Sequence, residues 1–279
     1  MNLRNFIGLI WLFPSVLWSQ MDSLPFFAGQ PIDWAKTKGV LPKFQQKDLV
    51  VRIVRLNNLV YAFEKEGSPA WQDDWHFAEI TGDRYVDGIF SGKTKFHKGW
   101  HTFVSLGDSA MKYPLKGDFP GYVASLKHGH GGIEMVLRDD PGEGEFITTI
   151  THQFWAYGSD RWESAWEIQY VSTTEIPALG NPDQHVLKLP MALRTSPRDL
   201  REPAIDYNGD GKPDGMGNVV AEFAPGAKVR RYAIHKEGDL EWSFVTIEGK
   251  ISPKGLIPAF SRPNVHVAGW IPSGAFLKP

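Results

Sequence analysis

The chain contains no cysteine. Disulfide bonds are therefore excluded, and so is a lipid-attachment cysteine behind a leader peptide. An exported protein of this kind must draw its stability from burial of apolar surface or from a bound metal ion. The missing cysteines therefore direct attention to sequence motifs that bind metals.

The chain also has no basic excess, because 30 Lys and Arg face 32 Asp and Glu, for a formal charge of −2 and a pI of about 6.5. This balance disfavours nucleic acid as a principal partner. The apolar run between Phe6 and Leu17 holds roughly 12 residues, fewer than the ~20 that span a bilayer. With Arg4 before it and Ser19 after it, the run predicts a secretory signal peptide over residues 1–19, with an uncut anchoring helix as the alternative.

After cleavage we expect no stable membrane span and a secreted or periplasmic location. Several enzyme signatures are missing as well: the chain has no G-x-S-x-G elbow, P-loop, dinucleotide fingerprint or H-E-x-x-H motif. The carboxylates of Glu163 and Glu167, four residues apart on one predicted strand, would lie roughly 13 Å apart, too far for glycoside hydrolysis. These absences remove the enzyme classes that are easiest to recognise.

Hydrophobic residues make up 42% of the chain and charged residues 22%, which predicts a folded core rather than disorder. Aromatic residues reach 13%, with 11 Trp. So many Trp side chains suit either a β-rich core or flat platforms for sugar rings, and composition alone does not separate these two uses.

The pattern after residue 47 is that of short strands separated by turn residues. We expect hairpins that pair 48–54 with 59–65 across Asn57-Asn58, 121–127 with 133–138, 146–158 with 162–171, and 219–224 with 228–235, followed by a strand at 239–247. No segment after the leader predicts an amphipathic helix. The sequence thus predicts one all-β domain over residues 47–279, a sandwich, barrel or propeller, behind an irregular lead-in at 20–46.

The segment AIDYNGDGKPDG at 204–215 has the composition of a calcium loop. Side-chain oxygens fall at alternate positions, Gly211 permits a sharp turn, and calcium takes six to eight oxygen ligands. The predicted ligands are Asp206, Asn208, Asp210, the carbonyl of Lys212, and Asp214. Gly217 replaces the bidentate Glu of an EF-hand, so the loop is not one. The alternative is a turn rich in Asn and Asp that binds nothing.

A second segment, 79–88, repeats this skeleton 127 residues before Asp206. Its predicted, weaker ligand set consists of Glu79, Thr81, Asp83 and Asp87. Arg84 stands where the first loop has the turn glycine. We therefore expect the same local fold at 79–88, with ion binding left open.

These two loops resemble those of FG-GAP/VCBS repeat proteins, whose blades carry a D-x-N-G-D-G-x-x-D loop between strands. The resemblance covers about 12 residues twice. It implies a β-propeller-like fold with Ca²⁺-binding loops that tie strand ends together, and a surface that binds a glycan or a protein. A β-sandwich of the jelly-roll type with one or two calcium loops is the alternative.

The function expected from these features is that of a secreted, calcium-stabilised binding or interaction protein rather than an enzyme. The alternative is a secreted lyase that acts on polymers containing uronic acid. Such a lyase needs a His or Tyr base and a cation that neutralises the carboxylate of the substrate. The residues that could supply this chemistry are His128, His130, His152, Tyr157 and Arg161.

Overall fold

The computed structural model of the chain consists mainly of β-strands, which confirms the all-β prediction. It describes residues 30–37, 40–41, 47–63, 73–94, 99–110, 112–129, 131–141, 147–177, 182–199, 206, 212, 217–248 and 265–276. The predicted signal peptide at 1–19 lies outside these residues. The described part of the lead-in contains a short 3-10 helix, η2 (Trp34–Lys36).

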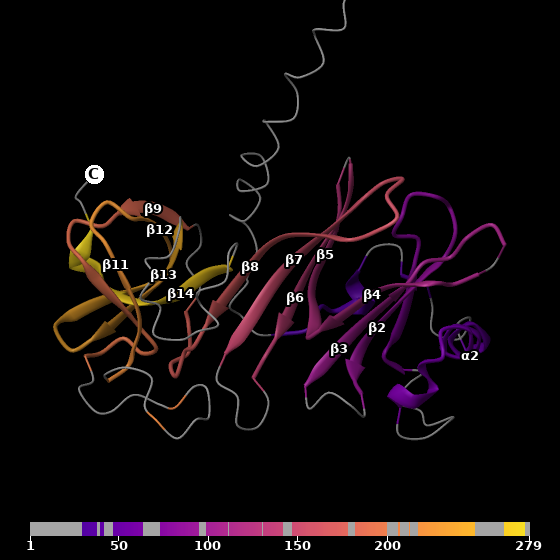
Figure 1. Cartoon of the computed structure of the whole chain (residues 1–279), viewed down its shortest axis with the longest axis horizontal. Coiled ribbons are helices and arrows are strands. Elements are labelled where there is room, and N and C mark those ends of the chain that lie inside the picture. The colour runs from indigo at the N-terminus through magenta and orange to yellow at the C-terminus, as the bar shows by residue number, and fades with distance from the viewer. Residues whose placement is uncertain are drawn as a thin grey trace, which may run out of the picture.

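A four-stranded antiparallel sheet comes first along the chain (Figure 1). Its strands follow one another in chain order: β1 (Trp75–Ala78), β2 (Asp87–Lys93), β3 (Trp100–Ser105) and β4 (Leu115–Pro120). Each strand therefore pairs with the next one along the chain, as consecutive elements usually do. The β1–β2 connection is the predicted loop at 79–88.

A second sheet begins with four further antiparallel strands. They are β5 (Tyr122–His128), β6 (Gly132–Asp139), β7 (Thr148–Ala156) and β8 (Glu163–Tyr170). The pairing of β5 with β6 and of β7 with β8 confirms two of the predicted hairpins. In both cases the alternating pattern and the turn residues between the strands favour the same structure.

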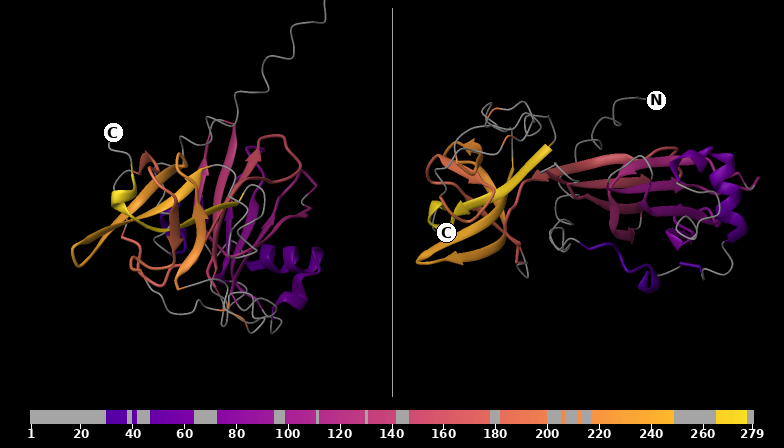
Figure 2. Two further views of the ribbon diagram at one scale, coloured as in Figure 1. Left: turned by 60° about the vertical axis from the view of Figure 1, so that its left-hand side comes forward. Right: turned by 90° about the horizontal axis from the view of Figure 1, so that it is seen from below.

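The second sheet continues through strands from the end of the chain, in the order β8-β14-β13-β12-β9. These are β9 (Asp183–Val186), β12 (Lys228–Glu237), β13 (Leu240–Glu248) and β14 (Val265–Pro272). The β8–β14 pair is parallel, and it links the two groups of strands at opposite ends of the molecule (Figure 2). Strands from the middle and from the end of the described chain thus share one continuous, curled sheet.

The predicted hairpin between 219–224 and 228–235 is wrong, although both segments are strands. β11 (Val219–Phe223) pairs with β10 (Met191–Arg194), whereas β12 pairs with β13 and β9. The turn at Gly226 explains the difference, because its N–H donates to the carbonyl of Leu187 (2.8 Å), and the N–H of Leu187 donates to Ala227 (3.0 Å). The turn therefore binds a distant segment and does not close its own hairpin.

The predicted strand at 48–54 is also wrong, because α2 (Lys47–Leu56) is a helix. Val50, Ile53 and Val54 are buried at the three- and four-residue spacing of one helical face. Asn58, predicted as part of a hairpin turn, has φ 58° and ends the helix in the left-handed conformation. The 3-10 helix η4 (Leu59–Ala62) follows, where the second strand of that hairpin was expected.

Both faces of the β5–β8 segment contribute to a core. On one face Ile133, Met135 and Leu137 pack with Ile89 and Val104 of the first sheet. The opposite face lies inside the curl of the sheet and includes a second core, formed by Val136, Ile150, Trp166, Ile168, Tyr170, Tyr232, Trp242, Phe244 and Trp270. The aromatic surplus of the sequence is thus used in part to fill this core.

Candidate functional site

The predicted calcium loop at 206–214 lies largely outside the described residues. Of its five predicted ligands, the structure describes Asp206, which is half-buried, and Lys212, which is exposed. Asn208, Asp210 and Asp214 fall outside. The calcium site therefore stays a prediction, and the loop at 79–88 is the copy whose geometry can be described.

The loop at 79–88 closes around the carboxylate of Asp87, which is fully buried. Its Oδ2 accepts hydrogen bonds from the N–H of Ile80 (2.9 Å) and of Thr81 (3.2 Å) and from the Thr81 hydroxyl (3.2 Å). Its Oδ1 accepts from the N–H of Gly107 (2.8 Å). Asp87 also pairs with Ala78 in the β1–β2 ladder, so one side chain ties together the loop, its two strands and the segment after β3.

Burial raises the pKa of Asp87 to about 7, although the N–H donors of Ile80 and Gly107 act in the opposite direction. The nearby charge of Asp83 adds to the increase. Within the described ranges no cationic side chain pairs with Asp87. This carboxylate is therefore held by hydrogen bonds alone.

The other acidic residues of the loop each use one oxygen to hold the turn. Glu79 Oε1 accepts from the N–H of Gly82 (2.5 Å), and Asp83 Oδ1 accepts from the N–H of Tyr85 (2.9 Å). Arg84 has φ 74°, a left-handed conformation that favours glycine, which is the residue at the matching position of the 206–214 loop. No group of three or more His, Cys, Asp or Glu side chains in the described part of the chain is placed to hold a metal ion.

The Tyr157 ring lies across this loop. A Cβ placed on Gly82 would come 3.1 Å from the Cδ1 and Cε1 atoms of that ring, and Gly82 itself has φ 79°. Tyr157 belongs to the turn between β7 and β8, where its N–H donates to Gly131 (3.1 Å). The structure thus brings a residue of the predicted catalytic set against the weaker of the two predicted calcium loops.

The remaining residues of the predicted catalytic set do not form one cluster. His128 is exposed at the end of β5 and faces Ile133, whereas His152 on β7 faces Val136, so the two histidines lie on opposite faces of the sheet. Arg161 is exposed in the turn before β8. His130 lies outside the described residues.

His152 is buried, with its ring stacked on Trp166 at 5.2 Å between centroids. Its Nε2 lies 3.7 Å from Glu134 Oε2, and its Nδ1 has no hydrogen-bond partner among the described residues. Burial, with a contribution from Lys127, lowers the pKa of His152 to about 4. The imidazole is therefore neutral at neutral pH and sits in the inner core rather than on an accessible surface.

One polar network on the same face has no counterpart among the predicted sites. Arg138 Nε donates to Asp140 Oδ1 (2.7 Å), and the Tyr122 hydroxyl donates to Asp140 Oδ2 (3.2 Å). Burial raises the pKa of Tyr122 and of Tyr170, so both phenols stay protonated. The sequence gives no signal for this network, because β-sheet register alone brings its members together.

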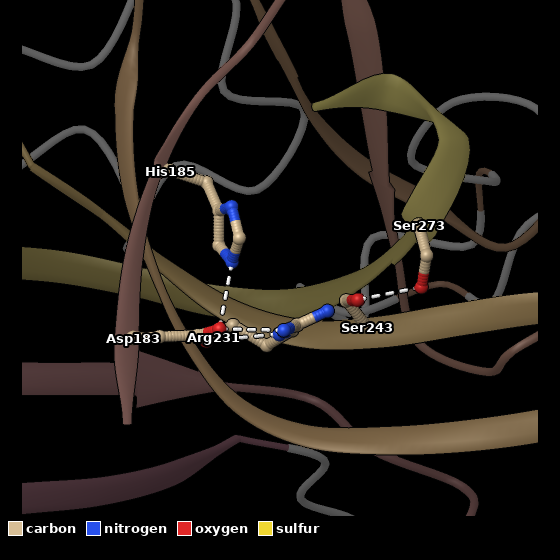
Figure 3. A network of polar contacts seen from close by, with 5 residues as sticks. All are labelled: Asp183, His185, Arg231, Ser243 and Ser273. Atoms are coloured by element: carbon tan, nitrogen blue, oxygen red, sulfur yellow. Dashed lines mark hydrogen bonds and ion pairs between the residues drawn. The ribbon is translucent and has the colours of Figure 1, made fainter. Parts of the chain in front are cut away.

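A second unpredicted network joins β9 to β12 (Figure 3). Arg231 binds both carboxylate oxygens of Asp183 (Nε–Oδ1 2.9 Å, Nη2–Oδ2 2.5 Å), and His185 Nε2 lies 3.0 Å from Oδ2. Burial opposes the charged form, but Arg231 and His185 together hold the pKa of Asp183 below its ordinary value. Beside this network, the hydroxyls of Ser243 on β13 and Ser273 form a hydrogen bond with each other (2.7 Å).

An Asp, a His and a Ser are also the residues of a hydrolase catalytic triad, but the contacts of Asp183 and His185 differ from those in a triad. The acid is paired with Arg231 instead of orienting the histidine alone, and the His185 ring is stacked on Phe276 with its centroid 4.4 Å away. We interpret the network as a link that holds the edge strand β9 to β12.

Comparison of the chain with models of protein families, with curated proteins and with solved structures found no match. Within the described residues, no helix is both long and apolar enough to cross a membrane.

Proposed function

We propose that this chain is an exported, calcium-stabilised binding module that recognises a ligand outside the cytoplasm. The observation that carries the proposal is the geometry of Asp87, whose carboxylate joins the loop at 79–88 to both strands and to Gly107. A loop with this skeleton serves as a structural fastener between strands. The matching loop at 206–214 has the oxygen ligands with which a bound ion would join strands in the same way.

We assign the ion to the 206–214 loop rather than to 79–88. In the latter, both oxygens of Asp87 already accept hydrogen bonds, and Glu79 and Asp83 each hold a backbone N–H. In loop 79–88, these carboxylate oxygens therefore bind backbone N–H groups instead of an ion. At 206–214 three carboxylates would balance the charge of Ca²⁺, and their donor atoms are the hard oxygens that this ion prefers.

We further propose that the two sheets form a sandwich-like arrangement rather than a closed propeller. The first sheet has the up-and-down order of a propeller blade. In favour of a sandwich, one of its faces shares a core with β5–β7. Two sheets packed face to face bury an apolar layer between them, as in sandwiches.

Calcium dependence of stability and of binding, measured on the same protein, tests this function. The full chain is titrated with Ca²⁺ and with a chelator, and thermal unfolding and binding to an array of glycans and envelope proteins are followed in parallel. We expect chelation to lower the melting temperature and to weaken binding together, because ligand binding stabilises the folded state that it requires. A melting temperature and a binding profile that ignore the chelator would contradict the proposal.

A further inference from the structure

Two exposed aromatic side chains belong to neighbouring segments of the molecule. Among the large apolar side chains that the described part of the chain leaves exposed, the aromatic ones are Tyr85, with 41% of its surface accessible, and Tyr157, with 40%. Tyr85 belongs to the loop at 79–88, and Tyr157 lies against Gly82 of the same loop. We call the loop 79–88 together with the turn 157–161 the tyrosine surface.

Backbone contacts hold the two tyrosines in place. The N–H of Tyr85 donates to Asp83 Oδ1 (2.9 Å), and the N–H of Tyr157 donates to Gly131 (3.1 Å). Tyr85 follows Gly82 by three residues, so their Cα atoms lie at most about 11 Å apart. The backbone of Tyr85 therefore lies near the ring of Tyr157, in a loop whose shape Asp87 fixes.

An aromatic cluster of one buried and two half-buried side chains lies beside the turn that carries Tyr157. The Trp162 ring packs edge-on against Trp155 (5.5 Å between centroids) and against Phe119 of the first sheet (6.1 Å). Rigid aromatic rings lose little conformational entropy when a ligand covers them. The tyrosine surface thus combines exposed rings with a well-packed turn beneath Tyr157, as expected of a surface that binds a ligand.

Hydrogen-bonding groups of both kinds surround the rings. Glu79 Oε2 and Asp83 Oδ2 stay available as acceptors, because the turn uses only the other oxygen of each side chain. Arg84 and Arg161 are exposed, and no ion pair engages them within the described residues. The surface therefore offers acceptors and donors beside apolar rings, a combination that matches the hydroxyl groups and apolar faces of sugars.

The exposed acids of the tyrosine surface outnumber its exposed bases by one. The acids are Glu79, Asp83 and Asp160, the bases are Arg84 and Arg161, and Lys116 lies beside the surface, where its Nζ donates to the Asp160 carbonyl (3.3 Å). A surface without a positive excess gives no electrostatic attraction to a polyanion. This balance favours a neutral ligand over a polymer of uronic acids.

We propose that the tyrosine surface binds a neutral polysaccharide. Tyr85 and Tyr157 stack on the faces of its sugar rings, Glu79 and Asp83 accept hydrogen bonds from its hydroxyls, and Arg84 donates to its oxygens. The proposal rests on the assignment of this chain as a binding module. It adds the chemical class of the ligand and the residues that contact it.

Affinity electrophoresis and calorimetry of the full chain in calcium test this proposal. The probes are soluble neutral β-glucan, xylan and galactomannan, with a polyuronate as the charged comparison. We expect one or more neutral polymers to bind, Tyr85→Ala and Tyr157→Ala each to weaken that binding about tenfold or more, and Tyr157→Phe to retain it. Leu240→Ala, which removes an exposed apolar side chain on β13, is the matched control and should bind like wild type.

Each contrary outcome overturns the proposal. The first two are that no neutral polymer binds, or that the two alanine variants bind as tightly as wild type. The others are that the chain prefers or cleaves the polyuronate, or that a protein ligand binds at these tyrosines. Calcium-dependent binding that is insensitive to both tyrosines would contradict this inference and leave the proposed binding function intact. Binding that needs the tyrosines but does not depend on calcium would support this inference and contradict the calcium dependence of the proposed function.

Discussion

At the scale of single residues, two buried titratable groups shift in opposite directions. The pKa of Asp87 is raised by burial to about 7, and the pKa of His152 is lowered by burial to about 4. Between pH 4 and 7 the folded state therefore holds more protons on Asp87, and fewer on His152, than the unfolded state. Stability from Asp87 falls as the pH rises through this range, whereas stability from His152 is present above its unfolded pKa of 6.5 and is lost as the pH falls toward 4.

We expect His152→Phe to remove the loss of stability that this histidine contributes as the pH falls from 7 to 5, and to leave the opposite contribution of Asp87 in place. The variant keeps a ring against Trp166 and removes the group that must stay neutral in the core. In the wild type, the contribution of His152 to the free energy of unfolding should fall by about 2 kcal/mol as the pH goes from 7 to 5. Urea unfolding at both pH values measures the difference, with exposed His128→Phe as the control. A pH dependence in His152→Phe equal to that of wild type would contradict the assignment.

The sequence predicts the residue types of these sites better than their surroundings. The segment 146–158 is correctly predicted to contain a strand, and its pairing with β6 is regular from Thr149 to Ala156. Which face of β7 meets a core depends on segments from far along the chain, such as those that carry Trp242 and Trp270. For this reason the sequence names His152 as a catalytic candidate, whereas the fold places it in a core.

At the scale of elements, the errors occur where distant contacts override local preference. The segment 47–56 is rich in β-branched residues, which favour strands, yet the first sheet offers an apolar face for Val50, Ile53 and Val54 to cover. The turn at Gly226 similarly bonds to Leu187 instead of closing a hairpin. The hairpins that are correct, β5–β6 and β7–β8, are those whose strands follow one another and pair locally.

Ile53→Ala tests the assignment of α2 as a packed helix. Ile53 is fully buried in the core with Trp75 and Phe90, whereas Leu56 at the end of the same helix is 58% exposed. Removing the Ile53 side chain should lower the free energy of unfolding by about 2–5 kcal/mol, and Leu56→Ala should change it little. Chemical denaturation of the two variants measures both values. Similar losses in the two would contradict the helical face described above.

At the scale of the whole molecule, stability must come from long-range packing and from loops that tie strands together. The parallel pairing of β8 with β14 joins strands β5–β8 to strands from the end of the chain in one curled sheet. The all-β class could be predicted because alternation is local. This pairing could not, because it depends on the three-dimensional path of the chain between the two strands. Loop 79–88 illustrates how a chain without disulfides fastens its strands.

Thermal unfolding of Asp210→Ala, with and without calcium, tests the central claim most directly. Asp210 is the central predicted carboxylate of the ion site, and Asp239→Ala, in the exposed turn between β12 and β13, is the matched control. Saturating calcium should raise the melting temperature of wild type and of the control by about 5 °C or more, and should leave Asp210→Ala near the chelated value. A melting temperature of Asp210→Ala equal to that of wild type at millimolar calcium would contradict a structural calcium site in this loop.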